Sequence, residues 1–162
     1  MALRKPYEAS YLVATAREDH LDEIARIERE SFLIPWKREF FETELAESYR
    51  YARVLVSRDG SPPVVGGYLF AVSLYEEFHI NKIATDPSLR NRGLGRLLLD
   101  DALARARVLR ATAITLEVRI SNIPAREFYG SCGFREAYRR KAYYQDGEDA
   151  FAMVRPLEAV RR

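Results

Sequence analysis

The chain switches repeatedly between two spacings of hydrophobic residues, one typical of helices and the other of strands. In the range 15–31, apolar residues such as Leu21, Ile24 and Ile27 recur every three or four positions, which predicts an amphipathic helix. In the range 113–119, apolar and polar residues alternate, which predicts a strand with one buried face. The changes of spacing therefore outline the order of the elements.

This pattern predicts seven strands and four helices in the order β-α-α-β-β-β-α-β-α-β-β, which is an α/β arrangement with a mixed sheet and helices on both faces. The expected strands are 8–14, 51–57, 64–75, 78–85, 113–119, 134–143 and 150–155. No repeat or long linker divides the chain, so we expect one domain spanning residues 1–162.

Local signals mark the ends of the helices. Thr15 and Glu18 have the spacing of a capping box at the start of the first helix, which breaks within 31–36. The second helix is expected to turn Phe40, Phe41 and Leu45 inward. A third helix is expected over 94–108, and a short fourth helix begins at its N-cap Asn122 and ends at Gly133.

Composition limits the class of protein. The chain is 48% hydrophobic and 31% charged, as in soluble globular proteins, and its 26 basic and 24 acidic residues give a net charge of +2, which argues against a dedicated nucleic-acid binder. The single cysteine, Cys132, excludes an internal disulfide and a Cys-based zinc site, and is expected to be a buried packing residue.

No apolar run approaches the ~18 residues of a membrane span, and the N-terminus has no signal-peptide core. A cytoplasmic enzyme is therefore expected.

The most informative segment is 83–96. An apolar strand leads into an Asp-Pro turn at Asp86, then into a basic loop in which Arg90, Gly93 and Gly95 form the pattern Arg-x-x-Gly-x-Gly, and then into a Leu-rich helix. The first turn of a helix offers unpaired N–H groups and the positive end of the helix dipole. Glycines let a phosphate approach that backbone without interference from a Cβ atom. The segment therefore predicts a phosphate cradle.

Two common phosphate-binding motifs do not fit this loop. A dinucleotide-binding fold requires Gly-x-Gly-x-x-Gly, but Leu98 stands where the third glycine is needed. A triphosphate loop requires Gly-Lys-Ser/Thr, but Arg96 and Leu97 follow Gly95. The order Arg-x-x-Gly-x-Gly between a strand and a helix is instead similar to the pyrophosphate loop of the GNAT superfamily of acyl-CoA N-acyltransferases.

The resemblance to this superfamily covers nearly the whole chain and implies its fold, with a central mixed sheet of about seven strands. The segments 116–122, 128–129, 133–134 and 143–150 resemble the RimI ribosomal-protein alanine N-acetyltransferases and the archaeal protein N-terminal acetyltransferases. Many relatives of the archaeal type carry a functional glutamate in the loop between the first two helices, where this chain has Ile34. That departure favours a RimI-like specificity.

The resemblance implies an acetyl-CoA site and no metal. The pyrophosphate would rest on the N–H groups of Asn91, Arg92, Gly93, Leu94, Gly95 and Arg96, and the pantetheine arm would lie along Ile83, Ala84 and Thr85. A backbone N–H of this strand would stabilise the oxyanion of the tetrahedral intermediate. Asn122 is implied as a further CoA contact, in addition to its role as a helix cap.

Glu117 is the first candidate for the general base. An α-amine has a pKa of about 7.7–8.0, against about 10.4 for a lysine side chain, so a carboxylate acting through water is sufficient for an N-terminal acceptor. Glu117 alternates away from the apolar face of its strand, although a structural pair with Arg119 or another cation is the alternative. His79 is the second candidate, at a position where the archaeal relatives share a histidine; a structural histidine is the alternative.

Tyrosines supply the remaining candidate chemistry. A phenol with a pKa near 10 can donate a proton to the CoA thiolate, whose thiol has a pKa of about 8.5. The resemblance places Tyr129 as this general acid, and a packing role in the core is the alternative. Tyr143 and Tyr144 would wall the peptide groove; on one strand they would face opposite sides, so only one is expected to contact substrate. The basic run of Arg135, Arg139, Arg140 and Lys141 is expected to be a solvated strand face, with contact to an acidic peptide or to CoA phosphates as the alternative.

Together these features favour N-terminal acetylation of a ribosomal or other cytosolic protein by direct attack of its α-amine on acetyl-CoA. Two other functions stay open. Acetylation of a small amine or metabolite is disfavoured by the hairpin of Tyr143 and Tyr144, and a non-catalytic CoA-sensing subunit is disfavoured by the presence of both Glu117 and Tyr129. The sequence leaves the preferred N-terminal residue, the oligomeric state and any auxiliary subunit open.

Overall fold

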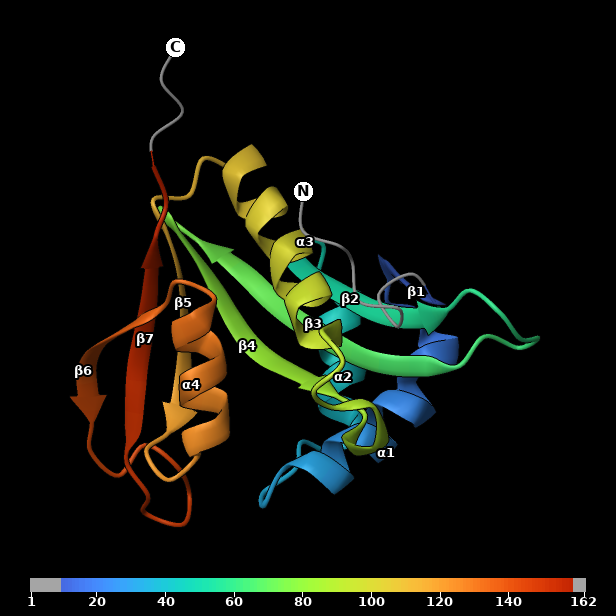
Figure 1. The fold of residues 1–162 in the computed structure, drawn as a ribbon, viewed down its shortest axis with the longest axis horizontal. Helices are drawn as coiled ribbons and strands as arrows, with labels where there is room; N and C mark the ends of the chain where they lie inside the picture. Colours follow the sequence, from blue (N-terminus) through green and yellow to red (C-terminus); the bar gives the residue numbers. More distant parts are fainter. Residues whose placement is uncertain (1–9, 159–162) are drawn as a thin grey trace. The chain divides into compact units, whose positions relative to one another are not determined.

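The computed structural model describes residues 10–158 of the chain (Figure 1). The strands are β1 Tyr11–Thr15, β2 Arg50–Ser57, β3 Val65–Leu74, β4 Glu77–Thr85, β5 Ala113–Arg119, β6 Arg135–Arg140 and β7 Ala150–Pro156. The helices are α1 Leu21–Ser31, α2 Arg38–Ala46, α3 Leu94–Val108 and α4 Ile123–Ser131, with short 3-10 helices at Glu18–His20 and Pro87–Leu89. The predicted order of strands and helices is confirmed; residues 8 and 9 of the first expected strand lie outside the described range.

The seven strands form a mixed sheet in the order β1-β2-β3-β4-β5-β7-β6. Strands β4 and β5 are parallel, whereas β1 with β2, β5 with β7 and β6 with β7 are antiparallel. The predicted mixed α/β sheet is therefore confirmed. The parallel ladder consists of Glu77–His79 paired with Ala113–Thr115, so the later residues of β4 lie beyond it.

The chain packs as two compact units. Of the described residues, the first comprises 10–71 and 82–102, and the second comprises 72–81 and 103–158. Within residues 10–158, no helix is long and apolar enough to cross a membrane.

The core of the first unit forms where α1 and α2 bury their apolar faces. In α1 the predicted spacing is confirmed, because Leu21, Ile24, Ile27 and Glu28 are all buried. In α2 only Phe41 is fully buried, and its ring packs against Trp36, Tyr68 and Phe70. The prediction for Phe40 is wrong: it is 59% exposed, because the residue next to Phe41 projects from a different side of the helix. Its ring lies 6.3 Å from that of Trp36.

The predicted capping box at Thr15 and Glu18 is also wrong. Thr15 is the last residue of β1, and its hydroxyl accepts a hydrogen bond from Arg53 at 2.8 Å. A 3-10 turn precedes α1 instead, and the Arg17 backbone N–H donates to Nδ1 of His20 at 3.0 Å. The capping pattern is therefore present two residues later, with histidine in place of the glutamate.

The second unit is built around β5 and β7. Ile114, Leu116 and Val118 of β5 are buried, as their alternation predicts, and β5 pairs with β7 along its whole length. Helix α4 begins at Asn122, whose Oδ1 accepts from the N–H of Ala125 at 3.3 Å. Cys132 is buried at the end of this helix, and its carbonyl accepts from Arg155 at 2.7 Å.

Strand β6 is shorter than predicted. It ends at Arg140 rather than at 143, its register against β7 shifts between Glu136 and Tyr138, and Ala142 adopts a φ of +48°. Tyr143 and Tyr144 therefore lie in the loop between β6 and β7, and the prediction that they face opposite sides of a strand is wrong.

A substitution tests the tight contact between β3 and β4. A Cβ atom on Gly67 would lie 2.7 Å from the carbonyl oxygen of Ala84, which belongs to the backbone and cannot rotate away. We expect Gly67→Ala to destabilise the protein by about 1–3 kcal/mol, as overpacking does in a closely packed core. Gly130→Ala is the control, because no atom lies within 4 Å of its added Cβ, and it is expected to be neutral or stabilising by up to about 1 kcal/mol. Chemical denaturation of both variants measures the difference, and equal stabilities would contradict it.

Candidate active site

The carboxylate of Glu117 lies in a polar row in the second unit. Its Oε2 is 3.0 Å from Nε2 of His79, and its Oε1 accepts a hydrogen bond from Nη1 of Arg140 at 2.8 Å. The side chain is 11% exposed. The residue therefore fits both the catalytic role and the alternative of a paired strand glutamate, but its partners are His79 and Arg140 rather than Arg119.

His79 extends the row to Thr115. The two residues are directly opposite in the parallel ladder, and Nδ1 of His79 lies 2.7 Å from the Thr115 hydroxyl. Because a carboxylate only accepts hydrogen bonds, the contact with Glu117 assigns the ring proton to Nε2. In the neutral ring, Nδ1 then accepts from Thr115. The two base candidates are therefore adjacent, and His79 is oriented from both sides.

The environment of Glu117 favours its ionised form. Burial acts to raise the pKa of this carboxyl, but the contacts with His79 and then Arg140 outweigh burial and leave the pKa below its usual value. A pocket of about 320 Å³ opens beside it, with His79, Glu117, Tyr138, Arg140 and Tyr143 among its lining residues. An ionised acceptor of protons thus faces a space large enough for part of a substrate.

Tyr129 lies on α4 with its ring between Phe128 and Phe134, at centroid distances of 5.4 and 5.8 Å. It is 9% exposed. Burial, with smaller contributions from Tyr144 and Cys132, raises its pKa well above the usual value of a phenol. Its hydroxyl therefore stays protonated at neutral pH, as a proton donor requires, and its packing also agrees with the structural alternative.

The two tyrosines of the β6–β7 loop contact each other, with ring centroids 5.1 Å apart and nearly perpendicular planes. Arg140 stacks over Tyr143 at 4.6 Å and Arg119 over Tyr144 at 4.0 Å. Burial raises the pKa of both phenols, that of Tyr144 to about 12. Arg119 also bonds Asp146 and Glu148 at 2.8 and 3.0 Å, so the loop is fixed by ion pairs rather than by strand hydrogen bonds.

The predicted phosphate cradle lies in the first unit. Strand β4 ends at Thr85, a 3-10 turn follows, and Asn91 and Gly93 take positive φ values of 62° and 84° before α3 begins at Leu94. The first-turn N–H groups of α3 have no intrahelical acceptor. The segments Ile83–Thr85 and 91–96 therefore join a strand end, a glycine loop and a helix start, which fits an anionic group such as pyrophosphate.

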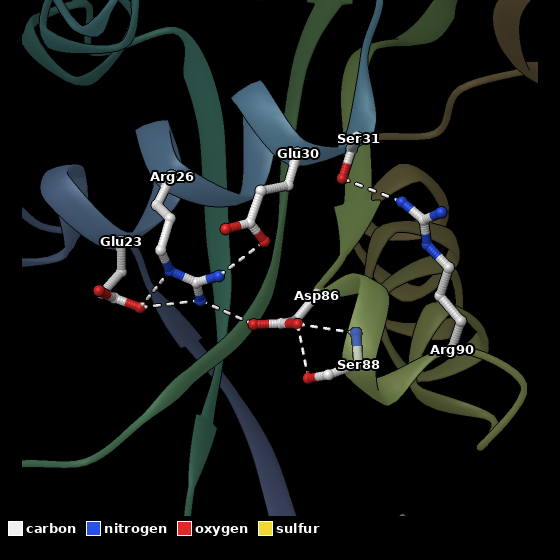
Figure 2. Close-up of polar contacts among 7 residues, drawn as sticks. All are labelled: Glu23, Arg26, Glu30, Ser31, Asp86, Ser88 and Arg90. Carbon is white, nitrogen blue, oxygen red and sulfur yellow. Dashed lines mark hydrogen bonds and ion pairs between the residues drawn. The ribbon is translucent and has the colours of Figure 1, made fainter.

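Figure 2 shows how side chains hold this loop against α1. Arg26 contacts Asp86 at 2.7 Å as well as Glu23 and Glu30 on its own helix. Asp86 is buried and also accepts from the backbone N–H and hydroxyl of Ser88 at 2.9 and 2.7 Å. Burial acts to raise the pKa of Asp86, but Arg26 and Ser88 outweigh it and lower the pKa. The turn before the cradle is therefore fixed by a charged network.

Arg90, the first residue of the loop motif, points away from the loop. Its guanidinium donates to the hydroxyl of Ser31, the last residue of α1, at 3.0 Å (Figure 2). The arginine of the motif therefore anchors the loop through its side chain.

A substitution at Arg26 tests the role of this network. We expect Arg26→Met to raise the KM for acetyl-CoA about tenfold with little change in kcat, because the turn at Asp86 loses its cation and the cradle loses its fixed geometry. Arg29→Met, an exposed arginine on the same helix, is the matched control. Calorimetric titration with CoA measures the affinity directly; equal affinities in the two variants would contradict the expectation.

Several residues of these sites were not predicted as partners. Arg140 was expected to be solvated, and Thr115, Arg26 and Asp86 carried no role. The alternation of residues in a strand predicts the side of the sheet on which a side chain lies, but it does not predict which residue of another strand that side chain contacts. In the described part of the chain there is no group of three or more His, Cys, Asp or Glu residues arranged for a metal ion.

Three comparisons relate the chain to known proteins. Residues 21–134 match the Acetyltransferase (GNAT) family. The [ribosomal protein bS18]-alanine N-acetyltransferase of Salmonella typhimurium is 32% identical over 135 residues, covering 82% of this chain and 88% of its own. The N-alpha-acetyltransferase of Sulfurisphaera tokodaii is 32% identical over 160 residues, covering 91% of this chain and 93% of its own. The crystal structure of the Escherichia coli ribosomal-protein-S18-alanine N-acetyltransferase superposes with a TM-score of 0.81 at 27% identity, covering 94% of this chain and 97% of that one.

Proposed function

Because the chain belongs to the Acetyltransferase (GNAT) family, whose members use acetyl-CoA, we propose that it acetylates the α-amine at the N-terminus of a protein, with a ribosomal protein as one candidate acceptor. The observation that carries this proposal is the ionised carboxylate of Glu117, oriented by His79 and Arg140 at an open pocket. The bacterial relative is named as an alanine N-acetyltransferase of ribosomal protein bS18 and the archaeal relative as an N-alpha-acetyltransferase, which supports the acceptor class.

In this proposal the first unit binds acetyl-CoA. The N–H groups of Asn91, Arg92, Gly93, Leu94, Gly95 and Arg96 hold the pyrophosphate, and Asn122 remains a proposed CoA contact. The main chain of Ile83, Ala84 and Thr85 pairs with the pantetheine arm; the end of the β4–β5 ladder at His79 supports this role, because this part of β4 is not paired with β5. When bound, acetyl-CoA supplies the activated acetyl thioester.

The second unit moves protons. Glu117 accepts the proton of the attacking α-amine through a water molecule, and His79 holds the carboxylate in place through its Nε2. Tyr129 donates a proton to the departing thiolate. Tyr143 and Tyr144 contact the acceptor's first residues, which the fixed β6–β7 loop presents in one arrangement.

The acceptor class follows from the strength of the base. An α-amine with a pKa of about 7.7–8.0 is partly neutral at physiological pH, whereas a lysine side chain at about 10.4 is almost wholly charged. A carboxylate with a lowered pKa is a weak base, and it is therefore suited to the α-amine. We place this activity in the cytoplasm, carried by a single domain over residues 1–162, without nucleic acid or membrane as a partner.

A peptide panel tests the proposal. Purified protein is incubated with acetyl-CoA and short peptides that differ in their first two residues, and CoA release is followed by thiol detection. Turnover on peptides with a free N-terminus, and none on the same peptides with a blocked N-terminus and an internal lysine, is expected. Turnover confined to Ala-first peptides would indicate a RimI-like specificity, and broad turnover the archaeal type. Turnover only on small primary amines would overturn the proposal in favour of a metabolite acetyltransferase, and CoA binding without any turnover would favour a sensing subunit.

A further inference from the structure

The pocket beside Glu117 extends beyond the residues that carry the proposed chemistry. Its volume is about 320 Å³, and Leu74 and Glu77 line it together with Glu117 and His79. All four residues belong to the second unit. Glu77 and His79 share one face of β4 because they are two residues apart, whereas Phe78 between them is buried on the other face. A second carboxylate, with no part in proton transfer, is therefore present in the same pocket.

The strand register sets the spacing of the two carboxylates. Glu77 is paired with Ala113 at the start of β5, and Glu117 follows four residues later on that strand. At about 3.3 Å per residue, the backbone positions of the two glutamates are offset by roughly 13 Å along the strands. Two residues of an extended peptide span about 7 Å, and a long side chain covers the rest. A side chain on the second or third residue of an acceptor can therefore reach Glu77 while the α-amine lies at Glu117.

Glu77 carries the unmatched charge of this pocket. Arg140 and Glu117, the other ions of the lining, are paired with each other at 2.8 Å. Among the residues that the structure describes, no cation is paired with Glu77, which is exposed. The other arginines of β6, Arg135 and Arg139, lie outside the lining. The charge that an incoming side chain meets beside Glu77 is therefore negative.

Apolar side chains contribute to the same lining. Leu74 at the end of β3 is 50% exposed, Tyr138 of β6 is 59% exposed, and both line the pocket with Ala152 and Val154 of β7. Lysine and arginine bury an apolar stem along such surface and keep the charged head in water. The ring of a tyrosine also attracts a cation. Apolar walls with one exposed carboxylate therefore suit a long basic side chain better than a small or an acidic one.

We propose that Glu77 is a specificity residue that selects acceptors with lysine or arginine at the second or third position, through an ion pair with that side chain. This rests on the proposed function, which places the α-amine of a protein beside Glu117. The stem of the basic side chain packs against Leu74 and Tyr138, and its head meets Glu77 at the exposed part of the pocket. Because an exposed ion pair contributes modestly and is screened by salt, the selection is expected to be about fivefold in kcat/KM at low ionic strength.

Two series of peptides test this selection. The peptides share one sequence with a free N-terminal alanine and differ only at the second position, or only at the third, where they carry lysine, methionine or glutamate. Methionine keeps an apolar stem without the charge. In one of the two series, the wild-type kcat/KM is expected to be about fivefold higher for lysine than for methionine, and lowest for glutamate. The ratio of lysine to methionine is expected to fall towards one in about 1 M salt, where charges are screened within about 3 Å.

Variants at position 77 assign the selection to one carboxylate. Glu77→Gln is expected to remove the preference for lysine over methionine, and Glu77→Lys to reverse the order so that glutamate is preferred. Glu76→Gln and Glu76→Lys are the matched controls, because Glu76 is the adjacent exposed glutamate and lies outside the lining. We expect the controls to keep the wild-type order. In all four variants, kcat on the methionine peptide and the KM for acetyl-CoA should change by less than about twofold, because an ion pair with the acceptor is absent from both.

Three results would overturn the proposal: equal wild-type kcat/KM for the lysine and methionine peptides in both series, a wild-type preference for glutamate, or the same preference in the Glu77 and Glu76 variants. Absence of wild-type turnover on every peptide would overturn the proposed function instead. Calorimetric titration of the same peptides into the CoA-bound protein then decides the charge preference without turnover. Tighter binding of the lysine peptide, lost in Glu77→Gln, is expected there, and equal affinities in the wild type would overturn the proposal.

Discussion

Replacing Glu117 by glutamine is expected to lower kcat about 10²- to 10³-fold, because general-base catalysis contributes factors of this size and an amide cannot accept the proton. Glutamine keeps the length of the side chain, and its amide oxygen still accepts a hydrogen bond from Arg140. The KM for acetyl-CoA is therefore expected to change by less than about twofold, since a group that acts only in the transition state leaves ground-state binding unaltered. Steady-state kinetics with the best peptide of the panel measures both constants. Glu127→Gln, an exposed glutamate on α4, is the control.

An unchanged kcat in Glu117→Gln would assign the base to another group, with His79 as the next candidate. The pH profile of the wild-type enzyme separates the two. The pKa of Glu117 lies below its usual value because His79 and Arg140 outweigh the effect of burial, so this carboxylate is already ionised where the acceptor amine titrates. The rise of kcat/KM with pH is therefore expected to follow the α-amine, near pH 8.

The same lowered pKa affects stability in a definite direction. A carboxyl whose pKa is lower in the folded state than in the unfolded state stabilises the fold above its unfolded pKa, and this contribution is lost as the pH falls through the folded value. Glu117→Gln is therefore expected to unfold at a lower temperature than wild type near neutral pH. The difference should narrow on acidification, which thermal unfolding at a series of pH values would detect.

Replacing Tyr129 by phenylalanine is expected to lower kcat about 10²-fold, because the departing thiolate then lacks its proton donor. The ring packing against Phe128 and Phe134 is kept, so the protein is expected to fold normally. Burial raises the pKa of this phenol, which keeps the hydroxyl protonated throughout the working range. The loss of activity in the variant should therefore be the same from pH 6 to about pH 9, well below the usual phenol pKa of about 10.

The control for Tyr129→Phe is Tyr75→Phe, at a fully exposed tyrosine. Wild-type kcat in Tyr129→Phe, with acetyl-CoA affinity retained, would assign Tyr129 to packing alone, as its 9% exposure also allows. A loss of folding, seen by circular dichroism, would show that the hydroxyl itself is needed in the core.

Elements with strong local signals could be predicted closely from the sequence. The bounds of α3 and β5 coincide with those expected, because a long apolar period and a strict alternation each specify one structure. The errors lie where tertiary contacts decide. Thr15 has the right neighbours for a cap, but pairing of β1 with β2 extends the strand through it. The strand expected over 134–143 ends early because the β6–β7 loop is held by Arg119 and its acidic partners.

The candidate sites also differ in how far the sequence predicts them, according to whether their residues are contiguous or are brought together by tertiary contacts. The loop of Arg90, Gly93 and Gly95 could be recognised because the residues that make it are contiguous. The pairing of Glu117 with Arg140 could not, since it depends on β7 lying between their strands and on the register of both ladders.

The burial of Cys132 has a practical consequence for measuring this enzyme. It is the single thiol of the chain and is 5% exposed at the end of α4, so reagents that detect the thiol of released CoA meet little background from the protein itself. Enzyme can therefore be used at concentrations comparable with the peptide. The first turnover then becomes visible as a burst or a lag, and the chemical step can be distinguished from product release without altering the chain.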